Sequence, residues 1–80
     1  MIFVYAIKSL SKNYIYVGMT NNFERRLTEY NSGQNRSTKA YRPFVLIYCE
    51  EFQDRATARI KEKYLKSGIG KEYLRSLANK

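Results

Sequence analysis

Two apolar runs stand close together near the N-terminus: IFVYAI at residues 2–7 and YIYVG at residues 14–18. The first run is rich in β-branched and aromatic residues and carries no charge, which predicts a strand that is buried on both faces. Residues 9–13 between the runs are mostly polar and have the composition of a turn. Because the connection is so short, the two runs are predicted to pair as an antiparallel β-hairpin.

A helix is predicted directly after this hairpin. Asn22 is suited to cap its N-terminus, because a short polar side chain can accept a backbone hydrogen bond there. The apolar face of this helix follows the spacing of one side of a helix and consists of Phe23, Leu27 and Tyr30. Gly33 suits the left-handed backbone position at which many helices end.

A third strand and a second helix are predicted further along the chain. Residues 44–49 form another apolar run, which is typical of a buried strand. Asp54 is suited to cap a helix over residues 55–67, because its carboxylate can accept a free backbone N–H of the first turn. Gly68 and Gly70 are expected to break this helix, since glycine is a poor helix former.

Residues 71–77 are predicted to form a short third helix. The order of elements is then β-β-α-β-α-α, which predicts an α+β fold with a three-stranded antiparallel sheet flanked by helices. The chain has 80 residues, of which 44% are hydrophobic. Because a typical domain has ~100–150 residues, residues 1–80 are expected to form a single domain.

The composition excludes several chemistries. The chain has no histidine, so it has no imidazole base, no Ser-His-Asp triad and no zinc site with histidine ligands. Cys49 is its single cysteine, which forms no internal disulfide and fits a reducing compartment. No apolar run approaches the ~20 residues that span a bilayer, and the N-terminus lacks the basic region of a signal peptide. We therefore expect a cytoplasmic protein without a membrane partner.

The charge balance points to an anionic partner. The chain carries 15 Lys and Arg residues against 7 Asp and Glu residues, a formal net charge of +8. Such an excess attracts polyanions, most often nucleic acid, although the alternative is a small basic protein that binds none. The residues expected to hold a nucleic-acid backbone are Arg36, Lys39 and Arg42 in the loop after the first helix, and Arg55, Arg59, Lys63 and Lys66 on the second helix. Contacts of this kind position a strand without identifying its bases, so low sequence specificity is expected.

One carboxylate on the predicted second helix stands out by its position. At 100° per residue, Glu62 lies about 40° from Ala58, between the apolar face and the basic face of the helix. A carboxylate at such a border is placed to reach a cleft. The alternative is an ordinary surface glutamate that pairs with Lys66, four residues further along the helix.

The residues reached so far resemble the GIY-YIG nucleases. Val4-Tyr5-Ala6 and Tyr16-Val17-Gly18 are similar to the two short motifs that name the family, and the likeness covers residues 2–75. Family members carry an arginine on the first helix, a histidine or tyrosine one turn later and a metal-binding glutamate on a later helix. The matching positions of this chain hold Arg26, Tyr30 and Glu62.

Two further stretches, residues 37–43 and residues 63–68, resemble the small stand-alone branch of the family. That branch is related to the amino-terminal domain of the bacterial excision-repair incision nuclease. The chain departs from the family pattern at the order of its first motif and at Met19, where members often have a lysine that can contact phosphate.

The resemblance implies a metal-dependent endonuclease that leaves 5′-phosphate and 3′-hydroxyl ends. It assigns Tyr16 as the general base for the attacking water, and nearby cations would favour the charged form of this tyrosine. Tyr5 on the neighbouring strand is expected to hold the water or a phosphate oxygen. Arg26, on the same helix face as Tyr30, is expected to clamp the phosphate. Glu62 is expected to be the one protein ligand of Mg²⁺ or Mn²⁺.

The expected substrate of the nuclease is DNA. Two other functions remain possible. The first is a nucleic-acid-binding module that has the same basic face but no useful turnover. The second is a protein-interaction domain whose charge serves solubility, and it predicts no salt-dependent affinity for nucleic acid. Because the chain is small, a protein partner that selects the nucleic-acid target is also possible.

Overall fold

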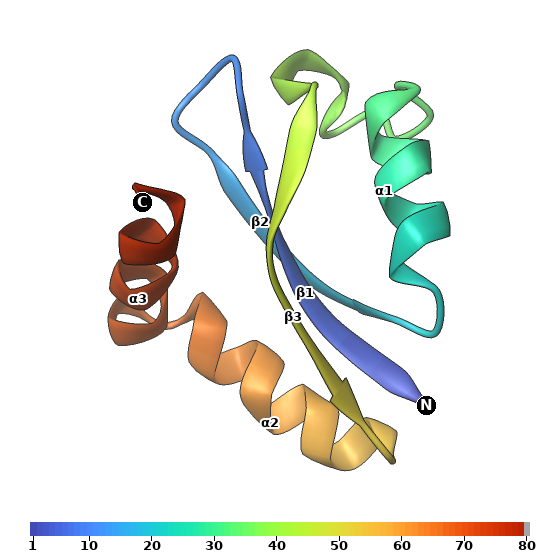
Figure 1. The fold of residues 1–80 in the computed structure, drawn as a ribbon, viewed down its shortest axis with the longest axis vertical. Coiled ribbons are helices and arrows are strands. Elements are labelled where there is room, and N and C mark those ends of the chain that lie inside the picture. The colour runs from blue at the N-terminus through green and yellow to red at the C-terminus, as the bar shows by residue number, and fades with distance from the viewer. Residues whose placement is uncertain (80) are drawn as a thin grey trace.

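The computed structural model describes residues 1–79, and its elements follow the predicted order β-β-α-β-α-α. The strands are β1 (Ile2–Ser9), β2 (Ile15–Thr20) and β3 (Phe44–Phe52), and the helices are α1 (Phe23–Asn31), α2 (Arg55–Lys66) and α3 (Gly68–Ala78). The strands form one antiparallel sheet in the order β2-β1-β3 (Figure 1). The predicted α+β fold is therefore confirmed. Within residues 1–79, every helix is too short or too polar to cross a membrane.

The central strand β1 is buried on both faces, as predicted. Val4, Tyr5, Ala6 and Ile7 are all at most 2% exposed. Successive side chains of a strand point to opposite faces, so these four residues belong to two apolar layers. Val4 and Ala6 pack with α2 and α3, whereas Tyr5 and Ile7 pack with α1. Figure 1 shows α1 on one side of the sheet and the other two helices on its opposite side.

The ends of α1 follow the predicted capping pattern. The side chain of Asn22 accepts a hydrogen bond of 3.1 Å from the backbone N–H of Arg25, and Gly33 has a φ of +80°. A further contact fixes this helix to the sheet. The side-chain amide of Asn31 accepts from the backbone N–H of Phe44 at 2.6 Å and donates to its carbonyl oxygen at 3.2 Å. The end of α1 is thereby tied to the first residue of β3.

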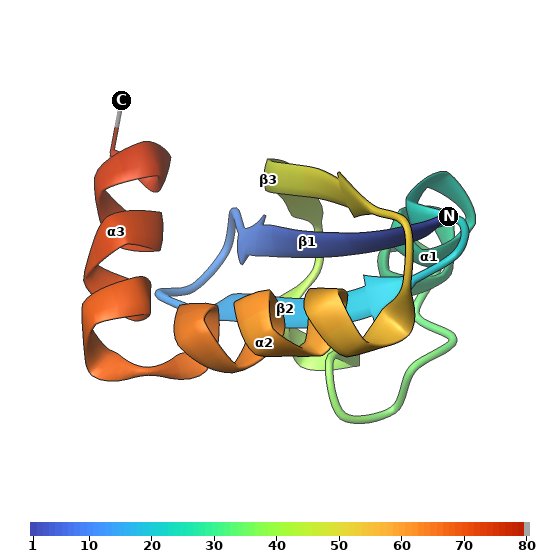
Figure 2. The same cartoon turned by 90° about the horizontal axis from the view of Figure 1, so that it is seen from below.

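The break between the second and third helices differs from the prediction. Gly68 and Gly70 do not separate two helices, because α3 itself begins at Gly68. The break is one residue earlier, at Ser67, whose side-chain hydroxyl accepts from the backbone N–H of Gly70 at 3.2 Å. Ser67 thus caps the new helix, and Figure 2 shows α3 turning away from the axis of α2. Ala58 and Leu65 are fully buried as the helical spacing predicts, whereas Ile69 lies beyond the break and is 71% exposed.

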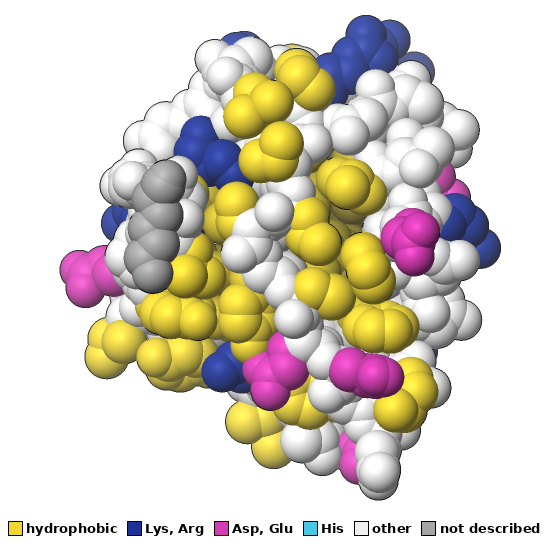
Figure 3. All heavy atoms as spheres, viewed as in Figure 1, with side chains coloured by type: hydrophobic (Ala, Val, Ile, Leu, Met, Phe, Trp, Pro, Cys, Tyr) yellow, Lys and Arg dark blue, Asp and Glu magenta, His cyan; other side chains and the backbone are white. Residues whose placement is uncertain are grey.

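The third strand is less buried than predicted and longer, since it extends to Phe52. Phe44 is buried, but Val45 and Leu46 are 38% and 36% exposed. β3 lies at one edge of the sheet, and the helices leave the side chains of Val45 and Leu46 partly uncovered. Figure 3 shows apolar side chains gathered over this edge of the molecule, with few lysines or arginines among them. The prediction of a buried strand at residues 44–49 is therefore wrong.

Candidate active site

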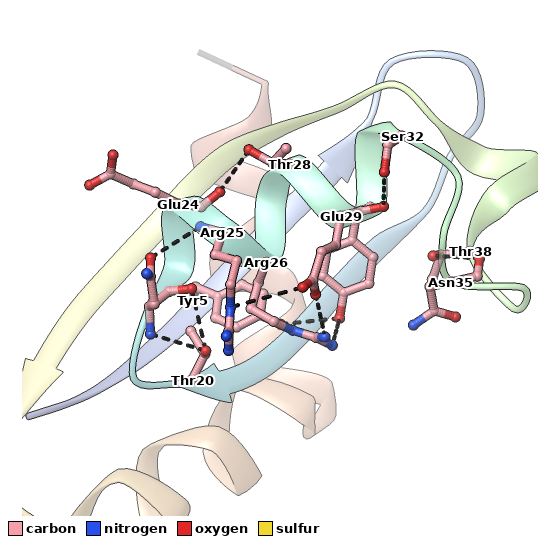
Figure 4. A network of polar contacts seen from close by, with 12 residues as sticks. Tyr5, Thr20, Glu24, Arg25, Arg26, Thr28, Glu29, Ser32, Asn35 and Thr38 are labelled. Atoms are coloured by element: carbon pink, nitrogen blue, oxygen red, sulfur yellow. Dashed lines mark hydrogen bonds and ion pairs between the residues drawn. The ribbon is translucent and has the colours of Figure 1, made fainter.

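Four of the predicted site residues meet on the α1 side of the sheet, and we call them the tyrosine–arginine cluster: Tyr5, Tyr16, Arg26 and Tyr30. The register of the hairpin explains why the two strand tyrosines share a face. Tyr16 lies opposite Ile7, two residues along β1 from Tyr5, and side chains two residues apart in a strand point the same way. Figure 4 shows Arg26 reaching from α1 toward this face, with Tyr5 beside it.

The hydroxyl of Tyr30 is the centre of the cluster. It lies 3.1 Å from the hydroxyl of Tyr5 and accepts a hydrogen bond of 3.0 Å from Nη2 of Arg26. The ring of Tyr30 lies 5.3 Å from that of Tyr16 between centroids, and the guanidinium of Arg26 stands 5.0 Å from its centroid. Tyr30 is 1% exposed and Tyr5 is 2% exposed, so both belong to the core as well as to the site. The side chain of Tyr30, and no backbone group, therefore satisfies the buried hydroxyl of Tyr5.

The glycine of the second motif makes room for this arrangement. A Cβ atom at Gly18 would lie 2.6 Å from the Tyr5 hydroxyl oxygen and 3.1 Å from the ring of Tyr16. Any side chain at Gly18 would therefore push the Tyr5 hydroxyl and the Tyr16 ring out of their present positions. The motif glycine is explained by this close approach of side chains.

Burial favours the neutral form of two tyrosines of the cluster, Tyr16 and Tyr30. Burial, followed by the neighbouring hydroxyl of Tyr30, raises the pKa of Tyr16, although Lys66 and Arg26 both act to lower it. Burial likewise raises the pKa of Tyr30, and the hydroxyl of Tyr5 is the main cause that raises the pKa of Arg26. The two cations expected to favour ionised Tyr16 are thus present, but burial outweighs them. Lys66 and Arg26 thus act in the expected direction, and burial has the larger, opposite effect on the pKa of Tyr16.

Glu62 lies on α2, on the other side of the sheet from α1. Its side chain is 16% exposed, and its Oε2 atom lies 3.2 Å from Nζ of Lys66. The simple ion pair that the helical spacing allowed is therefore present. Lys66 also acts electrostatically on Tyr16, so it links the helix of Glu62 to the strand that carries the predicted base.

The donor set around Glu62 fits a divalent ion that is shared with a substrate. Within residues 1–79, no three Asp, Glu or Cys side chains lie close enough together to hold a metal. Mg²⁺ commonly binds through one or two carboxylates and completes its shell with water and phosphate oxygens. One poorly exposed carboxylate therefore fits the ion in kind.

The structure places the predicted nucleic-acid contacts on two surfaces. All seven of these cations are exposed: Arg36, Lys39 and Arg42 in the loop after α1, and Arg55, Arg59, Lys63 and Lys66 on α2. Two of them lie near the cluster, Lys66 through its electrostatic effect on Tyr16 and Arg36 through a shared cleft. Arg36 lines a cleft of about 410 Å³ that is shared with α1 and is formed by Arg26, Glu29, Tyr30, Gln34, Asn35 and Arg36.

Sequence reasoning missed one residue of the site. Oε1 of Glu29 lies 2.8 Å from Nη1 of Arg26, and its Oε2 lies 3.9 Å from Nε of Arg25. The signal was the spacing of three and four residues between opposite charges on one helix. The Arg25 side chain is 61% exposed, which agrees with its predicted orientation toward solvent.

Tyr14, directly before β2, packs among other aromatic side chains. Its ring stacks on that of Tyr41 at 4.2 Å between centroids and meets the edge of Phe44 at 6.3 Å. Tyr14 therefore covers the end of the sheet where the loop returns to β3.

The chain is similar to known proteins over most of its length. The model of the family described as GIY-YIG catalytic domain matches residues 1–73. A UPF0213 protein of Clostridium perfringens is 31% identical over 81 residues, covering 100% of this chain and 86% of that protein. A UPF0213 protein of Desulfotalea psychrophila is 38% identical over 66 residues, covering 80% of this chain and 59% of its own length. The solution NMR structure of a UPF0213 protein from Bacillus halodurans superposes with a TM-score of 0.56 at 30% identity, covering 96% of this chain and 85% of that one.

Proposed function

Because the chain belongs to the GIY-YIG family, we propose that it is a metal-dependent endonuclease that hydrolyses nucleic-acid phosphodiester bonds. DNA is the proposed substrate, cut with low sequence specificity to leave 5′-phosphate and 3′-hydroxyl ends. The observation that carries the proposal is the meeting of Tyr5, Tyr16 and Tyr30 around the guanidinium of Arg26. Three hydroxyls and one permanent cation make a site that fits a phosphodiester and an attacking water.

Arg26 supplies the charge that a phosphate needs. Its planar guanidinium can donate two parallel hydrogen bonds to phosphate oxygens and can stabilise the negative charge that develops during attack. The hydroxyl of Tyr30 fixes the guanidinium of Arg26 by accepting a hydrogen bond from its Nη2. A guanidinium that is fixed before the substrate arrives loses less freedom on binding, which favours the transition state.

Tyr16 is the tyrosine of the cluster that can meet water. It is partly exposed, whereas Tyr5 and Tyr30 are buried. We assign Tyr16 as the group that takes the proton of the attacking water. Tyr5 and Tyr30 are assigned as the groups that orient this water. Because burial raises the pKa of Tyr16, its basic form is scarce at neutral pH in the free protein.

Glu62 is the proposed metal ligand. In the free protein its charge is balanced by Lys66 at 3.2 Å. A bound Mg²⁺ or Mn²⁺ would supply positive charge for the leaving 3′-oxygen. If the ion replaced Lys66 as the partner of Glu62, the lysine would be free to contact the nucleic-acid backbone. Lys66 is exposed on α2 and can reach such a partner.

Cleavage of labelled single-stranded, duplex and branched DNA and RNA tests the proposal, with Mg²⁺, Mn²⁺ or EDTA. We expect metal-dependent cutting by the wild type and by Tyr14→Phe, which changes a tyrosine outside the cluster. Tyr16→Phe should lose at least ~100-fold in rate, the size typical of a general base. Glu62→Ala should lose the metal-dependent cutting, because it removes the proposed metal ligand. Equal cutting by all four proteins would show that the activity comes from a contaminant.

A binding module without turnover is the second candidate. The raised pKa of Tyr16 and the Glu62–Lys66 ion pair both favour it, because each opposes catalysis in the free protein. This candidate predicts salt-dependent binding of nucleic acid that survives Glu62→Ala, without cleavage under any metal condition.

A further inference from the structure

A carboxylate stands inside the site that is proposed to bind phosphate. Glu29 places Oε1 at 2.8 Å from Nη1 of Arg26, while Nη2 of the same guanidinium donates to Tyr30 at 3.0 Å. Each Nη atom of Arg26 therefore already has one partner in the free protein, Glu29 at Nη1 and Tyr30 at Nη2. Since like charges repel, a carboxylate beside an incoming phosphodiester opposes its binding unless the carboxylate moves.

We propose that Glu29 is a positioning residue that occupies the phosphate side of Arg26 in the free protein and is displaced by the substrate. The inference rests on the proposed function, because it takes the phosphodiester to be the ligand of Arg26. Carboxylate and phosphate present the same pair of acceptor oxygens to a guanidinium, so one can replace the other without moving the arginine. The bond from Nη2 to Tyr30 stays in place during this exchange.

Exposure makes this exchange feasible. The side chains of Arg26 and Glu29 are 33% and 30% exposed, so an anion from solvent can reach the pair. Tyr30, the other partner of the guanidinium, is 1% exposed and cannot be replaced in this way. The two hydrogen bonds of Arg26 thus differ. An anion can compete for the bond to Glu29, whereas the bond to Tyr30 is shielded from solvent.

The displaced carboxylate has a second cation to accept it. Nε of Arg25 lies 3.9 Å from Oε2 of Glu29, and the Arg25 side chain is 61% exposed. Rotation toward Arg25 would keep the charge of Glu29 balanced while it leaves Arg26. The cleft of about 410 Å³ beside the pair gives room for this rotation, and Arg36 lines the same cleft as an additional cation for the incoming strand.

The proposal predicts that Glu29 lowers the affinity of the free protein for nucleic acid. Glu29→Gln should bind a short fluorescent DNA strand about two- to fivefold more tightly in EDTA, the effect expected from losing a partly exposed ion pair. Glu24→Gln is the matched control, because Glu24 is an exposed carboxylate on the same helix and the change removes the same charge. Any gain common to both variants reflects net charge alone.

A double-mutant cycle separates a direct effect on Arg26 from a general one. In an Arg26→Gln background, Glu29→Gln should change binding no more than Glu24→Gln does. A thermal melt confirms that each variant is folded. Glu29→Gln binding that equals the Glu24→Gln control, or weaker binding with a higher KM, would overturn the proposal.

Binding in EDTA and cleavage with metal report on different claims. If Arg26→Gln binds DNA as the wild type does, phosphate is not the ligand of this arginine and the proposed function fails with the inference. If Arg26→Gln weakens binding but Glu29→Gln does not tighten it, only the role of Glu29 is lost. With metal present, we expect Glu29→Gln to lower KM while kcat changes less than twofold.

Discussion

The hydroxyl of Tyr5 on the central strand lies 3.1 Å from the hydroxyl of Tyr30 on the first helix. The contact joins two residues that are 25 positions apart in the sequence and are both at most 2% exposed. Because Arg26 also donates to the Tyr30 hydroxyl, this buried contact couples the core to the candidate site.

Loss of the Tyr30 hydroxyl should therefore affect stability as well as activity. Tyr30→Phe keeps the ring but leaves the buried hydroxyl of Tyr5 without its partner, so we expect the free energy of unfolding to fall by about 1–3 kcal/mol. Urea denaturation measures this change. Tyr73→Phe is the matched control, since Tyr73 is 43% exposed and its loss should lie within about 0.5 kcal/mol of the wild type. An equal effect of both variants would contradict the structural role of the Tyr30 hydroxyl.

The motif glycine gives a second prediction. Gly18→Ala places a Cβ 2.6 Å from the Tyr5 hydroxyl, and we expect a loss of about 1–3 kcal/mol from the resulting overpacking. Gly68→Ala is the control, because a Cβ at Gly68 meets nothing within 4 Å. Thermal unfolding of both variants should show a clear drop for the first and little change or a slight gain for the second. A stable Gly18→Ala protein would mean that the tyrosines do not meet as described.

Stability should also depend on alkaline pH. Burial raises the pKa of Tyr14, Tyr16, Tyr30 and Tyr48. The unfolded chain loses these protons near the ordinary tyrosine value of about 10, whereas the folded chain retains them to higher pH. The free energy of unfolding is therefore expected to fall as the pH rises above about 10, and to be unaffected by these groups at lower pH.

Denaturation at about pH 8 and at about pH 11 measures this fall, and tyrosinate absorbance follows the ionisation directly. Tyr16→Phe should lose less stability between the two conditions than the wild type, since one of the shifted groups is gone. Tyrosinate absorbance that appears fully at the ordinary tyrosine pKa in the folded protein would refute the burial of these hydroxyls.

A metal-binding prediction follows from the ion pair on α2. Without nucleic acid, Mn²⁺ should bind weakly, because the proposed ligand Glu62 is a single carboxylate that is already paired with Lys66. Lys66→Gln should tighten Mn²⁺ binding about two- to fivefold by freeing Glu62, and Glu62→Gln should abolish it. Paramagnetic relaxation of water protons detects the ion, and Lys63→Gln on the same helix controls for net charge. Unchanged binding in Glu62→Gln would place the metal elsewhere.

Local patterns were enough to predict much of the fold. The β1 run, the Asn22 cap and the Gly33 terminus each depend on residues near in sequence, and each is found in the structure. The exposure of β3 was not predictable in this way, because an apolar run does not say whether its strand lies at the centre or the edge of a sheet. The start of α3 was missed because the cap at Ser67 outweighed the low helix propensity of Gly68.

The candidate site shows the same division. The resemblance named Tyr5, Tyr16, Arg26 and Tyr30 as site residues, helical spacing predicted the shared face of Arg26 and Tyr30, and the structure places all four on one side of the sheet. The pKa of Tyr16 could not be foreseen, since its burial depends on how α1 packs over the hairpin. The Glu29 contact also escaped prediction, because Arg26 had several possible partners and only the side-chain conformations select one.

The double role of Tyr30 has an evolutionary consequence. Under the proposed function, a relative without cleavage activity could lose Glu62 at little cost in folding, because a partly exposed ion pair contributes at most about 1 kcal/mol. It could not discard Tyr30 so easily, since that ring fills the core between Tyr16 and Phe44. Among relatives of this chain, loss of the carboxylate at the position of Glu62 should therefore indicate proteins without cleavage activity. The buried tyrosine at the position of Tyr30 should be present in active and inactive relatives alike.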